Sequence, residues 1–160
     1  MQLLWSPWRL EYVTAGGPGD EDCFLCAALE GSDDAEHLLL HRGQRCFTIL
    51  NKFPYNTGHS MVAPNRHVGQ LEDLEPAESA ELMELTTQTV SAIKKMMNPH
   101  GFNIGINLGQ VAGAGLPGHV HVHVVPRWGG DTNFMPVVGE TKVLPEALSD
   151  TYARLKPGFG

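Results

Sequence analysis

The sequence predicts an α+β domain in which one long helix packs against a five-stranded antiparallel sheet. Short apolar runs are separated by turn-forming residues, and one long amphipathic segment lies between the third and fourth runs. Hairpin connections of this kind favour a meander, with each strand beside the next. A shorter helical segment is expected near the N-terminus.

Three strands are expected before the long helix. The first two cover residues 38–40 and 46–50, and the turn 41–44 between them contains a glycine that suits a hairpin. A third strand over 59–64 follows a loop at 53–58.

The longest periodic segment runs from Pro76 to Met97. Its apolar residues recur at intervals of three and four, which is typical of one buried helix face. The proline suits the first helical turn, two lysines near the end complement the helix dipole, and an Asn-Pro pair stops the helix. A fourth strand over 102–108 and a glycine-rich loop then lead to the last strand.

Composition excludes several classes of protein. At 160 residues, with 42% hydrophobic and 18% charged residues, the chain is expected to form one globular domain. It divides into an N-terminal segment with a cysteine pair (1–36), a core (37–131) and a C-terminal extension (132–160). The net charge of −7 and the absence of a basic cluster argue against nucleic-acid and membrane partners. With no apolar run of membrane-spanning length and no signal-peptide pattern, a cytoplasmic location is expected.

The last strand carries three histidines at alternating positions. Alternation places His119, His121 and His123 on one face and the intervening valines on the other, core-facing side. Three cationic imidazoles would repel one another, so some must be neutral or an anion such as phosphate must lie among them. A half-exposed strand that carries histidine on its wet face, or a metal site, is the alternative.

The stretch HVHVHVV, residues 119–125, resembles the signature of the histidine triad (HIT) family of nucleotide hydrolases and transferases. Pro126 and Arg127 are similar to the dinucleoside-polyphosphate branch of that family. Upstream, NKFPYNTGHSMVAP (51–64) resembles the family's second conserved stretch, and the likeness covers about 38–131. It implies a HIT-like single domain and an adenosine nucleotide or dinucleoside polyphosphate as substrate.

The resemblance also implies roles for individual residues. His121 would attack an α-phosphate to form a nucleotidyl-histidine, which divides one displacement into two. A backbone carbonyl on a neighbouring strand could fix its tautomer, and His123 would bind phosphate and act as general acid. Asn51 and Asn107 would contact ribose or phosphate, and His59 would support the triad.

One loop departs from the family pattern. HIT hydrolases often carry Gln and Ser or Thr shortly before the first histidine, whereas this chain has AGLPG at 114–118. Stabilisation of the leaving group is therefore expected from Gln110, from backbone N–H groups of this loop, which contains Gly115 and Gly118, or from another segment.

The spacing of Cys23 and Cys26 suggests a metal or redox motif, and the resemblance to the HIT family implies a structural zinc site. In some relatives a cysteine pair, a histidine just after the third strand and the first triad histidine hold zinc. The matching residues here are Cys23, Cys26, His67 and His119. Without zinc, His119 would join the phosphate site. Magnesium could accompany the polyphosphate, and no organic cofactor is expected.

Three functions stay open on the sequence alone. Hydrolysis is preferred, because phosphorylases often replace the third histidine by Gln and this chain keeps His123. Phosphorolysis or nucleotidyl transfer is the second, supported by an N-terminal WSPWR and by PRWGGD at 126–131, which look like a bacterial phosphorylase branch. A nucleotide- or zinc-binding module without turnover is the third. A homodimer is expected from the resemblance, and Trp5 and Trp8 are expected to pack on the sheet, line a base pocket or contact a second subunit.

Overall fold

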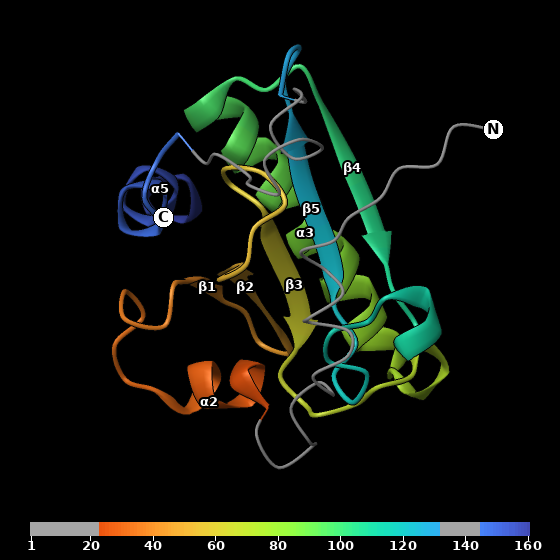
Figure 1. Ribbon diagram of the computed structural model, residues 1–160. Helices are drawn as coiled ribbons and strands as arrows, with labels where there is room; N and C mark the ends of the chain where they lie inside the picture. The colour runs from red at the N-terminus through yellow and green to blue at the C-terminus, as the bar shows by residue number, and fades with distance from the viewer. Residues whose placement is uncertain (1–22, 132–144) are drawn as a thin grey trace, which may run out of the picture.

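The computed structural model describes residues 23–131 and 145–160 (Figure 1). Five antiparallel strands form one open sheet in the order β1-β2-β3-β5-β4. The strands are β1 (Leu39–Arg42), β2 (Cys46–Leu50), β3 (Ser60–Pro64), β4 (Gly101–Ile106) and β5 (Val122–Arg127). The predicted α+β class and the five antiparallel strands are confirmed.

The meander order is wrong for the last two strands. β5 lies between β3 and β4, with Val62 opposite Val122 on one side and Ile106 opposite Val122 on the other. The reason is side-chain polarity: β5 is rich in valine and mostly buried, whereas the middle of β4, Asn103 to Gly105, is exposed. An apolar strand is more stable at the centre of a sheet, and a polar one tolerates an edge.

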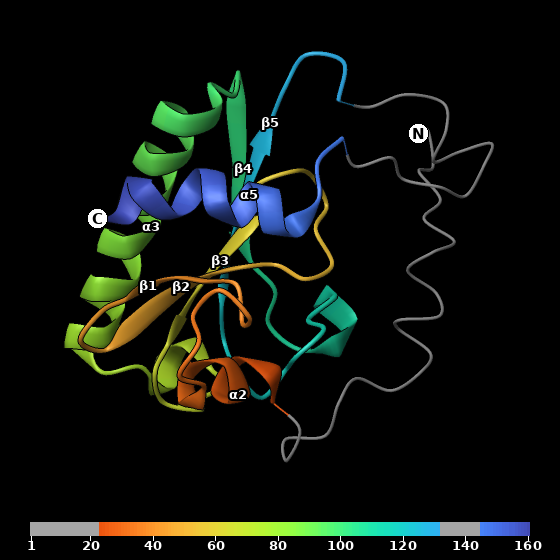
Figure 2. The same cartoon turned by 90° about the vertical axis from the view of Figure 1, so that its left-hand side faces the viewer.

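Helix α3 (Pro76–Met97) has the bounds that the sequence predicts. Glu75 and Glu78 form a capping box at its start, and Asn98 ends it in the left-handed conformation. The helix covers one face of the sheet, where it packs on β2, β3 and β5 (Figure 2). Its buried face meets the core-facing residues of these strands, including Cys46, Val62, Val122 and Val124.

The opposite face of β2 and β3 is covered by α2 (Phe24–Glu30), the predicted short N-terminal helix. Leu25 and Ala28 pack there with Phe47, Ile49 and Met61. Both faces of the central strands are thus buried, which explains why β2 and β3 consist of apolar and small residues throughout. Short 3-10 helices at η2 (Leu71–Asp73) and η3 (Gln110–Ala112) interrupt the loops.

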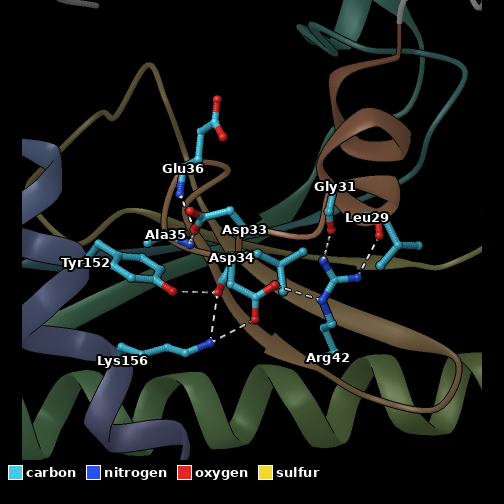
Figure 3. A network of polar contacts seen from close by, with 10 residues as sticks. Leu29, Gly31, Asp33, Asp34, Ala35, Glu36, Arg42, Tyr152 and Lys156 are labelled. Atoms are coloured by element: carbon cyan, nitrogen blue, oxygen red, sulfur yellow. Dashed lines mark hydrogen bonds and ion pairs between the residues drawn. The ribbon is translucent and has the colours of Figure 1, made fainter.

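The C-terminal extension contains α5 (Leu148–Leu155) and η4 (Lys156–Phe159), which the sequence did not predict. Leu155 and Phe159 join the core beside Leu40 and Ile93. Figure 3 shows how polar contacts fasten this segment: the Lys156 ammonium and the Tyr152 hydroxyl both donate to the Leu39 carbonyl, at 3.1 and 3.2 Å. Residues 148–159 therefore pack on the same core as β1 and α3.

None of the described helices is long and apolar enough to cross a membrane. The predicted roles of Trp5 and Trp8 fall outside the described residues.

Candidate functional site

The histidine face is less open than the sequence suggests. Val122 and Val124 pack toward α3 as predicted, and the histidines lie on the other side. Yet His119 is 0% exposed and His121 only 6%, and both precede the first residue of β5. His119 thus does not share a solvent-accessible surface with the other two histidines, because α2 and its cysteines cover it.

Hydrogen bonding determines the tautomer of His121. Its Nδ1 lies 2.8 Å from the His119 carbonyl oxygen, which can only accept, so Nδ1 carries the proton. Nε2 then keeps its lone pair. Burial lowers the pKa of His121, which favours the neutral ring. A carbonyl acceptor was expected on a neighbouring strand; it comes instead from the residue two positions earlier.

A second chain of contacts orders His123. The Tyr55 backbone N–H donates to His59 Nδ1 at 3.0 Å, so the proton of a neutral His59 lies on Nε2. That Nε2 is 3.0 Å from His123 Nδ1, which therefore accepts and leaves an N–H at His123 Nε2. The Tyr55 ring stacks on His123, with ring centroids 5.8 Å apart. The rings of His121 and His123 are in edge contact at 4.8 Å.

The two predicted asparagines border this pair. Asn51 is buried, accepts the Phe53 N–H at 2.8 Å and lies 3.4 Å from His59 Nδ1. The Asn107 amide nitrogen is 3.5 Å from His123 Nε2 and donates to the Gly113 carbonyl at 3.3 Å. The structure therefore gathers Asn51, His59 and Asn107 around the triad.

The glycine-rich loop is placed less directly. Gln110 is exposed in η3, and Gly115 and Gly118 are half-buried. A Cβ on Gly69 would lie 2.6 Å from the Pro117 carbonyl oxygen, so only glycine allows residue 69 to pack against Pro117 and Gly118. Gly69 therefore packs directly against the glycine-rich loop at Pro117 and Gly118. The sequence analysis did not predict this contact.

The four predicted metal ligands come together. Cys23, Cys26, His67 and His119 each offer a ligand atom, and these atoms all lie within 4.8 Å of one another. Cys23 Sγ is 3.3 Å and Cys26 Sγ 3.6 Å from His119 Nδ1, and Cys26 Sγ is 3.4 Å from His67 Nδ1. In a tetrahedral Cys₂His₂ zinc site, neighbouring ligand atoms are roughly 3.4–3.8 Å apart.

The protonation of the cluster also fits zinc. His119 Nε2 is 2.8 Å from the Pro64 carbonyl oxygen, so it carries the proton and Nδ1 faces the sulfurs with a free lone pair. Burial lowers the pKa of His119 to about 4, which keeps the ring neutral. Burial and the neighbouring Cys23 raise the pKa of Cys26 to about 11, so a metal would have to displace the thiol proton.

Four residues at the rim had no predicted role in the site: Tyr55, Asn56, Arg127 and Asp131, the last two known from the sequence only as part of the PRWGGD stretch. Together they connect the loop between Asn51 and His59 to β5. The two ends of that loop are the predicted site residues Asn51 and His59. Their positions could have indicated that the residues between them also lie close to the triad.

A family model for the HIT domain matches residues 33–130. The chain belongs to the HIT family. This HIT protein is 46% identical, over 94% of its own length and 80% of the relative's, to an AP-4-A phosphorylase of Mycobacterium tuberculosis. It is 36% identical, over 56% of its length and 48% of the relative's, to an asymmetrical bis(5'-nucleosyl)-tetraphosphatase of Schizosaccharomyces pombe.

Among solved structures, the HIT protein resembles a zinc-bound histidine triad family protein from Mycobacterium smegmatis. The TM-score is 0.70 at 26% identity, over 88% of this chain and 94% of that one. The likeness confirms the HIT fold.

Proposed function

We propose that this HIT-family enzyme cleaves a dinucleoside polyphosphate of the diadenosine tetraphosphate type and passes the nucleotidyl group to inorganic phosphate. The observation that carries the proposal is the free Nε2 lone pair of His121, which lies beside an N–H of His123. The phosphorylase relative, which is similar over most of both chains, supports phosphate as the acceptor.

In the first step, His121 Nε2 attacks the α-phosphorus. The bond from phosphorus to the bridging oxygen breaks, and its electron pair leaves with that oxygen as ATP. The His123 N–H meets the charge that develops on the departing oxygen. The phosphorylated ring of His121 becomes cationic, and the His119 carbonyl stabilises it through the Nδ1 proton.

In the second step, a phosphate oxygen attacks the same phosphorus and the P–N bond breaks. The bonding pair returns to His121 Nε2, ADP is released with the proton that phosphate carried, and solvent takes that proton up. Water in place of phosphate would yield AMP, and this is the hydrolytic alternative that the yeast relative supports.

Retention of His123 does not decide between the two acceptors. In the tautomer that its bond to His59 implies, the ring presents one N–H, and the amide of a glutamine would present the same kind of donor. The sequence-based preference for hydrolysis therefore loses its physical basis.

The remaining site residues have supporting roles in the proposal. Asn51 and Asn107 bind ribose or phosphate, His59 orients His123, and backbone groups near Gly115 and Gly118 with Gln110 contact the polyphosphate, which can carry Mg²⁺. Homodimer formation and a cytoplasmic location stay predictions.

Product analysis tests the function. The protein is incubated with diadenosine tetraphosphate with and without inorganic phosphate, and nucleotides are separated. ADP and ATP formed only with phosphate are expected; AMP and ATP formed without phosphate would show hydrolysis. H121N should lose turnover by about 10³-fold or more, since the nucleophile is removed. Full activity of H121N would exclude His121 as the nucleophile.

We also propose a structural zinc ion held by Cys23, Cys26, His67 and His119. Zinc there would join α2 to the chain that enters β5. Metal analysis should find about one zinc per chain, and C26A should lose it while C46A keeps it, because Cys46 lies in the α3-facing core. Under a tenth of an equivalent in the unmodified protein would contradict the site.

A further inference from the structure

The Asp131 carboxylate links two segments at the rim of the site, the end of β5 and the loop 51–58. It accepts two bonds from the Arg127 guanidinium, at 2.6 and 2.9 Å, and one from the Trp128 backbone N–H at 3.0 Å. It also accepts from the Asn56 amide nitrogen at 2.7 Å. The Asp131 side chain is only 10% exposed, and its bonds from Asn56 and Trp128 are partly buried, whereas the Arg127 side chain is 44% exposed.

Asn56 is the partner that reaches from the other side. Its amide nitrogen donates to Asp131 and also to the Pro126 carbonyl at 3.0 Å. Both partners can only accept, so the orientation of the amide is unambiguous and both of its N–H groups are used. One side chain therefore fastens the loop 51–58 to the end of β5.

The fastened loop carries the group that orients the histidines. Tyr55, the neighbour of Asn56, donates its backbone N–H to His59 Nδ1 and places its ring against both His59 and His123. The Asn56 carbonyl in turn accepts the His59 backbone N–H at 3.0 Å. A shift of Asn56 would thus move two of the groups that hold His59, the Tyr55 N–H and the Asn56 carbonyl.

We propose that Asp131 and Asn56 are positioning residues that keep the Nε2–H of His123 directed at the leaving oxygen. They act through Tyr55 and His59 and do not touch substrate. The inference rests on the proposed function, because it requires a leaving group opposite His123. It adds two residues outside the histidine motif to the set on which the rate of cleavage depends.

N56D and D131N test the proposal. N56D removes both donors and places a carboxylate against Asp131; D131N removes the charge that pairs with Arg127. Both variants should lower kcat for diadenosine tetraphosphate by about tenfold or more with KM changed by less than about threefold, because a misdirected donor mainly affects the transition state. N103A is the matched control, since Asn103 accepts from the same guanidinium at 2.7 Å without contacting the loop.

A second readout does not depend on turnover. Imidazole ¹⁵N shifts report the tautomers of His59 and His123, which should be single in the unmodified protein and in N103A, and mixed in N56D and D131N. Unchanged tautomers in the folded variants, or altered tautomers with kcat undiminished, would overturn the proposal. A failure of the proposed function would show differently: the unmodified protein would not turn over, while the tautomers would still respond to N56D.

Discussion

The tautomers of the three triad histidines are each determined by one backbone group. A carbonyl holds the Nε2 proton of His119 and another the Nδ1 proton of His121, while the Tyr55 N–H acts on His123 through His59. Histidines with the same spacing in sequence therefore present different atoms: His119 a lone pair that faces the cysteine sulfurs, His121 a lone pair on Nε2, and His123 an N–H donor. Alternation in the sequence predicts one shared face, and it contains no information on these backbone partners.

Replacement of His123 by Gln tests its role as a neutral donor. H123Q should keep ADP and ATP as products in the presence of phosphate, with kcat lower by about 10- to 100-fold because the amide is shorter and less well oriented. Chromatography of the nucleotides gives the products, and initial rates give kcat. AMP reports water as the acceptor and ADP reports phosphate. If H123Q and the unmodified enzyme differed in which of the two nucleotides they form, residue 123 would determine the acceptor, and its role as a simple donor would be contradicted.

The ion pair between Glu78 and Arg66 should contribute to the free energy of unfolding in a pH-dependent way. Its carboxylate is 4% exposed and binds Arg66 at 2.6 Å, and this bond holds the pKa of Glu78 at about 2 instead of 4.5. The stabilisation is present in full above pH 4.5 and is lost as the pH falls toward 2. E78Q should therefore unfold more easily by about 1–3 kcal/mol at neutral pH, with a smaller difference in acid.

Denaturant titrations of E78Q and the unmodified protein at several pH values measure this difference. E84Q, at an exposed position of the same helix, is the control and should stay close to the unmodified protein. A difference that grows on acidification would contradict the assignment.

At the scale of elements, α3 was predictable to the residue because its signals are local: periodic apolar residues, an N-terminal proline and an Asn-Pro stop. The helix α5 lacked such signals, since it spans eight residues and its burial depends on contacts with β1 and α3. The order of β4 and β5 depends on which strand is apolar enough to be buried inside the sheet. Rules for hairpin connections do not describe this preference.

L155A should show that the C-terminal extension is structural. Leu155 is 0% exposed within the core, so truncation should lower the free energy of unfolding by about 2–5 kcal/mol. S149A, at an exposed position of the same helix, is the control. Thermal or denaturant unfolding measures both, and equal stability of L155A and S149A would show that α5 does not contribute to the core.

At the scale of the whole molecule, the sheet separates two cores. One lies under α3, and the other lies under α2 beside the cysteine–histidine cluster. The four ligands were predictable from a resemblance, but their approach to one another required α2 to fold back onto β3, which no sequence spacing reveals. The proximity of the histidines and asparagines was predictable to the same degree. The contacts that Tyr55, Asn56 and Asp131 make with this group depend on the tertiary fold and were not predicted.

Removal of zinc should affect these two cores unequally. After chelation, amide hydrogens in α2, in 64–69 and in 117–120 should exchange faster, because the ion would join these segments. Amides of α3 should exchange as before, since that helix packs on the opposite face. Hydrogen exchange followed by mass spectrometry resolves the segments, and uniform deprotection of α3 and α2 would contradict separate cores.

The exchanged order of β4 and β5 has a consequence for how the chain assembles during synthesis. When residue 106 has emerged, β1, β2 and β3 can pair, but β4 has no hydrogen-bonded neighbour. The strand that carries His123 arrives last and must enter between partners that are about 60 and 20 residues behind it, which is a slow, non-local step. Until then the nascent sheet exposes the edge of β3, so the strand that carries His123 also covers an edge that could otherwise pair with another chain.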